Sequence, residues 1–275
     1  MFVPKLTSGD DFQGAWEPAT ATLDWCESNY VWNFYVAEWW NTLSNLLMIL
    51  FGLHGAVRVY RSGGEQRFFW SFLGLFVVGL GSWLFHMTLT YPMQLVDELS
   101  MLYVTSTLIY CAVEIKSDTA KPNYLLAAGL MVMTSLVCAF YILIGHPVFH
   151  QVVYVVMVVV LVVKTVQTLV EYPRYWRMFA FGLAVYLLGM AVWKVDVHLC
   201  AALRDLRATG PGSFAPVLLE FHAWWHLLAG LGTYIHIVIM AATRSDVMRS
   251  NPRLDVGFVM GFIPLLVSRP ASKQV

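Results

Sequence analysis

Charged side chains are scarce in this sequence. Asp, Glu, Lys and Arg make up only 12% of its 275 residues, whereas hydrophobic residues make up 59%. An ordinary soluble domain carries roughly 25% charged residues, and a soluble fold of this length has no interior large enough for so much apolar surface. The shortage of charge therefore excludes an ordinary soluble protein and favours a chain built for the lipid bilayer.

The sequence also lacks a net charge, a secretory signal and low-complexity segments. Its 17 basic and 17 acidic residues balance, so the charge does not point to nucleic acid as a partner. No short apolar region with a small-residue cleavage site stands at the start, and we expect the first span to direct membrane insertion itself. No linker divides the chain, which predicts one domain over residues 1–275.

Apolar stretches recur along the chain, each long enough to cross roughly 30 Å of hydrocarbon as a helix. They predict an all-α integral membrane protein, a seven-transmembrane helix bundle. The last apolar segment, 256–267, is short and contains Pro264, so we expect it to be interfacial and not an eighth span. The seven predicted spans lie near residues 36–58, 68–90, 95–115, 124–145, 149–170, 178–200 and 217–241.

Lys and Arg are unevenly divided between the two sides of the predicted bundle. One side holds three of them and the other holds twelve. Because basic residues are retained on the cytosolic side, we expect a cytosolic tail over 242–275 and a lumenal or extracellular segment over 1–35. The three are Lys5, Arg204 and Arg207; the twelve are Arg58, Arg61, Arg67, Lys116, Lys121, Arg174, Arg177, Arg244, Arg249, Arg253, Arg269 and Lys273.

Polar side chains cluster at the lumenal ends of four predicted helices, where lipid makes ionisable groups costly. Ser82 and His86 are four residues apart, as are His222 and His226, so each pair shares a helix face. Two histidines at this spacing can hold one Zn²⁺ ion, and a third from another helix leaves the fourth tetrahedral position for water. The alternative is a set of buried histidines that only form hydrogen bonds.

The metalloprotease pattern HExxH is missing, because Ala223 stands where its glutamate would be. A general base must come from another helix, and Asp97 is the candidate because it is expected at the same depth. The Ser82 hydroxyl is placed to stabilise a developing oxyanion. This set suits hydrolysis of an amide. The remaining histidines near these helices, His54, His146, His150 and His236, lack such partners and are not expected to act directly.

The segment before the first span is rich in oxygen ligands. Asp24, Glu27, Asn29 and Glu38 lie within fifteen residues, a set that suits Ca²⁺. The alternative is a solvated acidic strip that helps to keep the N-terminus out of the cytosol. On the same side, Cys26 and Cys200 are placed to form a disulfide, whereas Cys111 and Cys138 fall inside spans and are expected to pack there.

Several segments, in order and over most of the chain, resemble the alkaline ceramidases, and most closely their phytoceramidase branch. They are residues 16–18 (Trp-Glu-Pro), 22–30 (Thr-Leu-Asp-Trp-Cys-Glu-Ser-Asn-Tyr), 37–42 and 44–45, 79–89, 94–99 (Gln-Leu-Val-Asp-Glu-Leu) and 221–226 (Phe-His-Ala-Trp-Trp-His).

The resemblance implies a zinc-dependent hydrolase that cleaves ceramide, including phyto- or dihydroceramide, to a sphingoid base and a fatty acid in endoplasmic reticulum or Golgi membranes. It implies zinc on His86, His222 and His226, with Ser82 and Asp97 in catalysis. It implies regulatory calcium on Asp24, Glu27, Asn29, Glu38 and the carbonyl of Trp25. Lys194 and His198 are less typical of the family.

Three alternatives to a ceramidase follow from the same residues. The first is another zinc hydrolase of the same broad superfamily, resembling the receptor-like adiponectin and progestin receptors with their similar zinc sites, but the Asp24–Glu27–Asn29 segment argues against it. A receptor or transporter with structural zinc is disfavoured, because structural zinc is usually closed by four protein ligands. A G-protein-coupled receptor matches the helix number but gives three lumenal histidines no role.

Overall fold

The computed structural model describes residues 13–118, 121–209, 215–249, 253–259 and 263–269. Lys5 and Lys273, which contribute to the charge asymmetry, lie outside these ranges. Within them, seven helical segments are long and apolar enough to cross a membrane. This confirms the predicted helix bundle.

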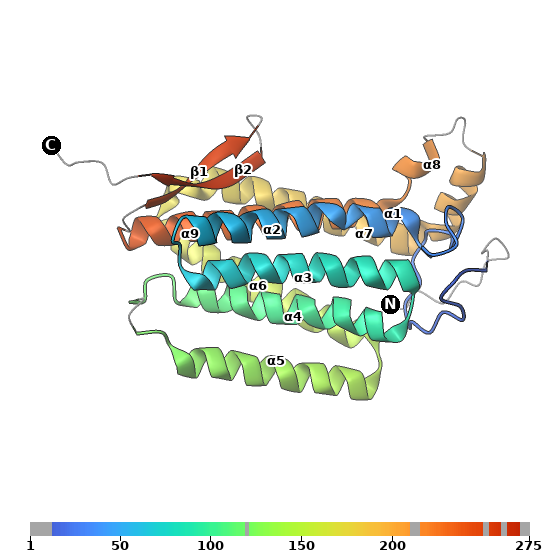
Figure 1. The fold of residues 1–275 in the computed structure, drawn as a ribbon, viewed down its shortest axis with the longest axis horizontal. Helices are drawn as coiled ribbons and strands as arrows, with labels where there is room; N and C mark the ends of the chain where they lie inside the picture. The colour runs from blue at the N-terminus through green and yellow to red at the C-terminus, as the bar shows by residue number, and fades with distance from the viewer. Residues whose placement is uncertain (1–12, 119–120, 210–214, 250–252, 260–262, 270–275) are drawn as a thin grey trace.

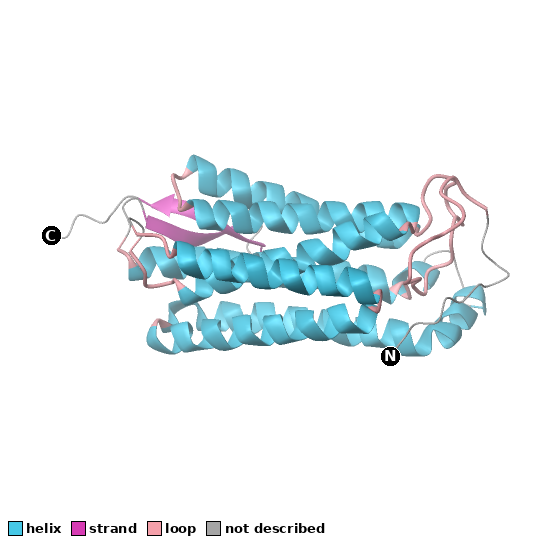
Figure 2. Cartoon of the chain, turned by 90° about the horizontal axis from the view of Figure 1, so that it is seen from below, coloured by secondary structure: helices cyan, strands magenta, loops and turns pink. Residues whose placement is uncertain are grey.

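The bundle is formed by nine α-helices and one short 3₁₀ helix among the described residues, and its long helices run side by side (Figures 1 and 2). The first span combines α1 and α2, and the sixth combines the 3₁₀ turn η1 with α7. The helices are α1 (Trp39–Ser44), α2 (Leu46–Arg61), α3 (Gln66–Thr88), α4 (Tyr91–Val113), α5 (Tyr124–Ile144), α6 (Pro147–Glu171), η1 (Pro173–Tyr175), α7 (Trp176–Thr209), α8 (Ala215–Leu218) and α9 (Phe221–Val247).

The predicted spans are in the correct places, but several ends differ. α4 begins at Tyr91 and α6 at Pro147, so Pro92 and Pro147 lie in first turns instead of separating helices. Proline is tolerated there because its missing N–H would have no partner inside the helix. α7 continues to Thr209 through a kink at Leu199, and α9 continues to Val247, past the predicted start of the tail.

A two-stranded antiparallel sheet follows α9. Strands β1 (Arg253–Val259) and β2 (Ile263–Arg269) occur where the interfacial segment 256–267 was predicted. Arg174 and Tyr175 both donate hydrogen bonds to the Asp255 carboxylate, and the Arg58 guanidinium donates to the Leu266 carbonyl. The hairpin is therefore fastened to the bundle, at the end opposite the N-terminal segment (Figure 1). Strands were not predicted for this segment from the sequence.

Close helix contacts depend on glycine where α2 meets α3. A Cβ atom added to Gly52 would lie 2.4 Å from the Phe76 backbone nitrogen and 2.7 Å from its Cα atom. Both are backbone atoms and cannot rotate away. Small residues allow membrane helices to approach in this way, because packing and not the hydrophobic effect holds them together in lipid.

Substituting Gly52→Ala should therefore destabilise the bundle by about 1–3 kcal/mol, the usual cost of overpacking. Thermal unfolding in detergent measures this as a lower midpoint temperature. Gly129→Ala is the matched control, because a Cβ atom there meets no atom within 4 Å. Equal losses in the two variants would contradict the close-packing explanation.

Candidate functional site

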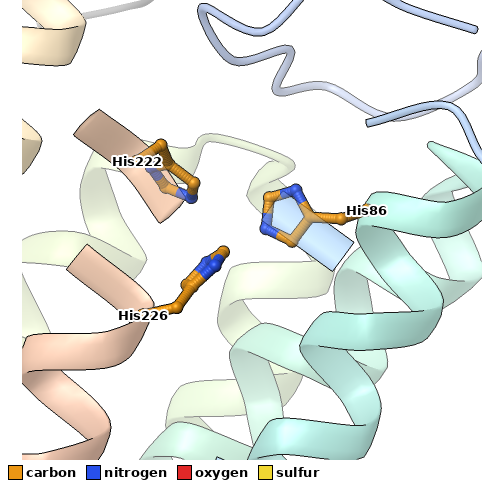
Figure 3. Close-up of side chains that lie close together, drawn as sticks. All are labelled: His86, His222 and His226. Atoms are coloured by element: carbon orange, nitrogen blue, oxygen red, sulfur yellow. The ribbon is translucent and has the colours of Figure 1, made fainter. Parts of the chain in front are cut away.

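Three buried histidines from two helices point toward one another (Figure 3). His86 lies near the end of α3, and His222 and His226 lie in the first turns of α9, which begins at Phe221. Their side chains are 1%, 4% and 4% exposed. Each offers one ring nitrogen, and these three atoms lie within 4.8 Å of one another. The structure thus brings together all three predicted zinc ligands.

Hydrogen bonds fix the orientation of two of these rings. The Nδ1 atom of His86 is hydrogen-bonded to the Glu38 carboxylate, which can only accept when ionised. The Nδ1 atom of His226 lies 2.8 Å from the Ser44 hydroxyl, which itself donates to the Asn41 carbonyl. Both rings are thereby assigned a proton on Nδ1 and a free lone pair on Nε2. This is the form in which outer partners hold metal-binding histidines.

The third ring, His222, tests whether a metal fits. It stacks on the Trp25 indole, with ring centres 4.0 Å apart and planes 18° from parallel. Its Nδ1 atom is buried and has no hydrogen-bond partner in the part of the chain that the structure describes. A buried polar nitrogen without a partner destabilises the fold, so a partner is expected at this atom. A zinc ion among three imidazole nitrogens would supply it, and the donor set suits that metal.

The predicted catalytic residues line the same cavity as the histidines. Ser82 and Asp97 contribute to a cavity of about 190 Å³ that also includes the three imidazoles and continues to His236 and Ile239. α3 and α4 approach closely here, because a Cβ atom at Gly81 would lie 3.2 Å from the Asp97 backbone. That approach places Asp97 beside the turn that carries Ser82.

The predicted calcium ligands are buried around the start of α1. Both Glu27 carboxylate oxygens accept backbone N–H groups, from Trp40 at 2.7 Å and Asn41 at 2.8 Å. The Glu38 carboxylate accepts the Trp25 N–H group at 3.2 Å as well as bonding to His86. The side chains of Asp24 and Asn29 are also buried, at 9% and 5% exposure.

Acidic side chains are concentrated in this region. Burial, and then the neighbouring Glu220 and Glu38 carboxylates, raise the pKa of Glu27 well above its ordinary value. Burial also raises the pKa of Glu220 to about 7, although Arg207 opposes the rise. Buried carboxylates that disfavour one another's ionised forms provide a suitable environment for a cation.

A disulfide joins Cys26 to Cys200, whose Cα atoms are 5.3 Å apart. It links the N-terminal segment to α7. Arg204 and Arg207 each donate to the Cys26 carbonyl at 3.0 Å, and Arg207 also pairs with Glu220. Cys111 and Cys138 are free and buried.

Some residues that shape the site were not predicted from the sequence. Ser44 was given no role, although a serine inside an apolar span is a signal of one. Trp25 was predicted to act only through its carbonyl, whereas its indole packs on His222. Of the four histidines given no role, His150 and His236 line the same cavity as the three but have partners of their own. His150 Nε2 lies 2.8 Å from the Glu98 carbonyl, and His236 Nε2 lies 3.3 Å from the Thr165 hydroxyl.

Comparison with known proteins gives consistent matches. The family model described as Ceramidase matches residues 17–266. The chain is 41% identical over 265 residues to alkaline ceramidase 3 of Mus musculus, covering 96% of this chain and 98% of the relative. It is 36% identical over 251 residues to alkaline ceramidase YPC1 of Saccharomyces cerevisiae, covering 84% and 79%. An alkaline ceramidase of Arabidopsis thaliana is 26% identical over 270 residues, covering 96% and 99%.

A zinc ion held by three imidazoles should be lost when one of them is removed. We expect His222→Ala to lose stoichiometric zinc, measured by elemental analysis of the purified protein, because two imidazoles cannot hold the ion as three do. Ser44→Ala should keep the ligands but weaken zinc affinity by about 10–100-fold, the usual effect of losing an outer partner. His54→Ala is the matched control, since that side chain is exposed on α2. Full zinc content in His222→Ala would exclude the metal assignment.

Proposed function

Because this chain belongs to the ceramidase family, we propose that its three-histidine site is a zinc centre at which ceramide is hydrolysed. The chain is an amide hydrolase and a multi-pass membrane protein. The observation that carries the zinc assignment is the partnerless, buried Nδ1 atom of His222 among two imidazoles that are already oriented.

His86, His222 and His226 would hold the ion. When bound, zinc supplies a Lewis acid for the amide carbonyl and lowers the pKa of a neighbouring water. Three protein ligands would leave a coordination position open to water, as in catalytic zinc sites and unlike structural ones. The oriented rings of His86 and His226 keep their Nε2 lone pairs directed into the cavity.

Asp97 and Ser82 would handle the proton and the developing charge. The Asp97 carboxylate takes a proton from the attacking water and delivers it to the amide nitrogen as the C–N bond breaks. The Ser82 hydroxyl donates a hydrogen bond to the carbonyl oxygen as it becomes negative. The products are a fatty acid and a sphingoid base. Both side chains line the cavity that contains the histidines, which supports these roles.

The rest of the cavity suits the hydrocarbon part of such a substrate. Beyond the histidines its lining is mainly apolar, with residues of α6, α7 and α9 such as Val158, Leu183 and Ile235. Pockets of this kind hold apolar ligands and use a few polar groups to orient them. Ceramide, dihydroceramide and phytoceramide share the amide that this arrangement addresses.

The acidic segment is the proposed calcium site, with Asp24, Glu27, Asn29, Glu38 and the Trp25 carbonyl as ligands. The mutual effect of Glu27, Glu38 and Glu220 on ionisation supports a cation there. Glu38 also bonds to His86, so a cation that fixes Glu38 would steady a zinc ligand. This contact is the physical basis for regulation by calcium.

The charge asymmetry and the Cys26–Cys200 disulfide support one orientation. Disulfides persist in oxidising compartments, and the cysteine pair is on the side with few basic residues. We therefore place the N-terminal side in the lumen and the C-terminal side in the cytosol, in endoplasmic reticulum or Golgi membranes.

Asp97→Asn separates an enzyme from a receptor-like protein with the same metal. The amide cannot accept the water's proton, so fatty-acid release from ceramide should fall by about 10²–10⁴-fold while zinc content stays unchanged. Asp205→Asn, at an exposed position of α7, should keep both. Undiminished release in Asp97→Asn would remove this residue from the mechanism.

Substitutions of Asp24 and Glu38 should differ in their effects on calcium and zinc binding. Asp24→Asn should weaken calcium binding by at least about tenfold, because affinity follows the number of charged ligands, and should leave zinc content intact. Glu38→Ala should lower both calcium and zinc affinity, since Glu38 also bonds to His86. Calorimetry with calcium and elemental analysis for zinc give the two readings. A wild-type calcium response in both variants would exclude the site.

A further inference from the structure

A short aromatic loop projects between two buried stretches of the N-terminal segment, residues 23–30 and 37–38. We define the aromatic loop as residues 31–35, in which Val31, Trp32, Phe34 and Tyr35 are 47%, 58%, 57% and 64% exposed. The residues on either side are buried: Tyr30 is 5% exposed and Ala37 1%. No charged residue occurs between positions 31 and 37. Four large apolar side chains held together in water would be unusual for a protein surface.

The loop is held in a fixed shape. The Tyr35 N–H group donates to the Asn33 side-chain oxygen at 2.7 Å, and Asn33 forms an isolated β-bridge with Val36. The Trp16 indole donates to the Tyr35 carbonyl at 2.9 Å, and the Ala15 N–H group donates to the Phe34 carbonyl at 2.9 Å. These backbone groups have partners within the protein, so the loop can enter a less polar medium at a reduced cost.

The loop is adjacent to surface that faces lipid. It ends shortly before Trp39, the first residue of the span Trp39–Arg61, and Trp32 packs edge-on against Trp40 with ring centres 5.8 Å apart. Along that span, Leu46, Leu50, Leu53 and Val57 are exposed. Their spacing of four, three and four residues forms one lipid-facing stripe. The exposed apolar surface of the span is therefore continued by the aromatic loop.

We propose that the aromatic loop inserts into the membrane interface, at the boundary between headgroups and acyl chains of the leaflet on the N-terminal side. Trp and Tyr favour this depth because their rings are apolar and their N–H or O–H groups are polar. The partner is bilayer lipid itself.

The insertion would support the metal site from outside the bundle. After the loop, the Ala37 and Glu38 N–H groups donate to the carbonyls of Met87 and His86, at 2.9 and 3.0 Å. The Glu38 side chain then bonds to the His86 ring. A loop inserted in lipid would therefore hold the adjoining segment, residues 36–38, whose Glu38 orients this imidazole. Ala37 and Glu38 thus connect the contact with the bilayer to the geometry of the site.

Spin-label depth measurements in phosphatidylcholine nanodiscs test the proposal on the full chain. One thiol is introduced at a time. The native cysteines should not react with the spin label, because Cys111 and Cys138 are buried and Cys26 is bonded to Cys200. Phe34→Cys is the test position and Tyr35→Cys repeats it should the first variant fold poorly. Leu136→Cys, 66% exposed on α5, is the lipid control. Asp205→Cys, exposed at the end of α7 beyond its kink at Leu199, is the water control.

The expected result is a shift of the loop position toward the lipid control. The label at Phe34→Cys should collide more often with oxygen, and less often with a water-soluble nickel chelate, than the label at Asp205→Cys. A nickel collision rate equal to that at Asp205→Cys would place the loop in water and overturn the proposal. Low rates with both reagents would show that protein, such as a second copy of the chain, covers the loop, and would also overturn it.

Discussion

The hydrogen bond between the Glu38 carboxylate and the His86 ring is the contact on which the site depends. Glu38 is 0% exposed and His86 1%, so neither group can exchange its partner for water. Loss of one partner in such a pair leaves the other buried and unsatisfied, which is more costly than the bond is favourable. The bond also determines which ring nitrogen of His86 faces the cavity. Through it, a residue that precedes the first span controls the chemistry of a residue at the end of α3.

The other two imidazoles depend on the same stretch of chain. His226 is oriented by Ser44 in α1, and His222 is covered by the Trp25 indole. α3 and α9 supply the three imidazoles, while residues between Trp25 and Ser44 hold them in place. Because this stretch is fixed further by the Cys26–Cys200 disulfide, the N-terminal segment is an integral part of the site. A bundle of seven helices without it would retain the three histidines but lose the supports for their orientation.

The spans and the histidine set were predictable because lipid imposes strong rules on sequence. Apolar length gives the spans, and a helical period places His222 above His226 and Ser82 above His86. The hairpin of β1 and β2 was not predictable, because the hydrogen bonds that fasten it form only in the folded chain. Arg174 donates to the Asp255 carboxylate and Arg58 donates to the Leu266 carbonyl. The contacts of the three imidazoles with other parts of the chain were not predicted for a similar reason. A serine inside an apolar span marks Ser44 as unusual, but the sequence does not show that Ser44 meets His226, that Trp25 packs on His222 or that Glu38 bonds to His86.

The balance of charge around the N-terminal segment favours a metal ion over an arginine side chain as its neutralising partner. Arg204 donates to the carbonyls of Cys26 and Glu27, and Arg207 donates to the Cys26 carbonyl and pairs with Glu220. The Glu27 carboxylate receives backbone N–H groups of Trp40 and Asn41, and the charges that shift its ionisation are acidic. Backbone donors orient such a carboxylate but add no full positive charge. A divalent ion would neutralise the cluster without a long side chain, and, because Glu38 belongs to it, would act on the same carboxylate that orients His86.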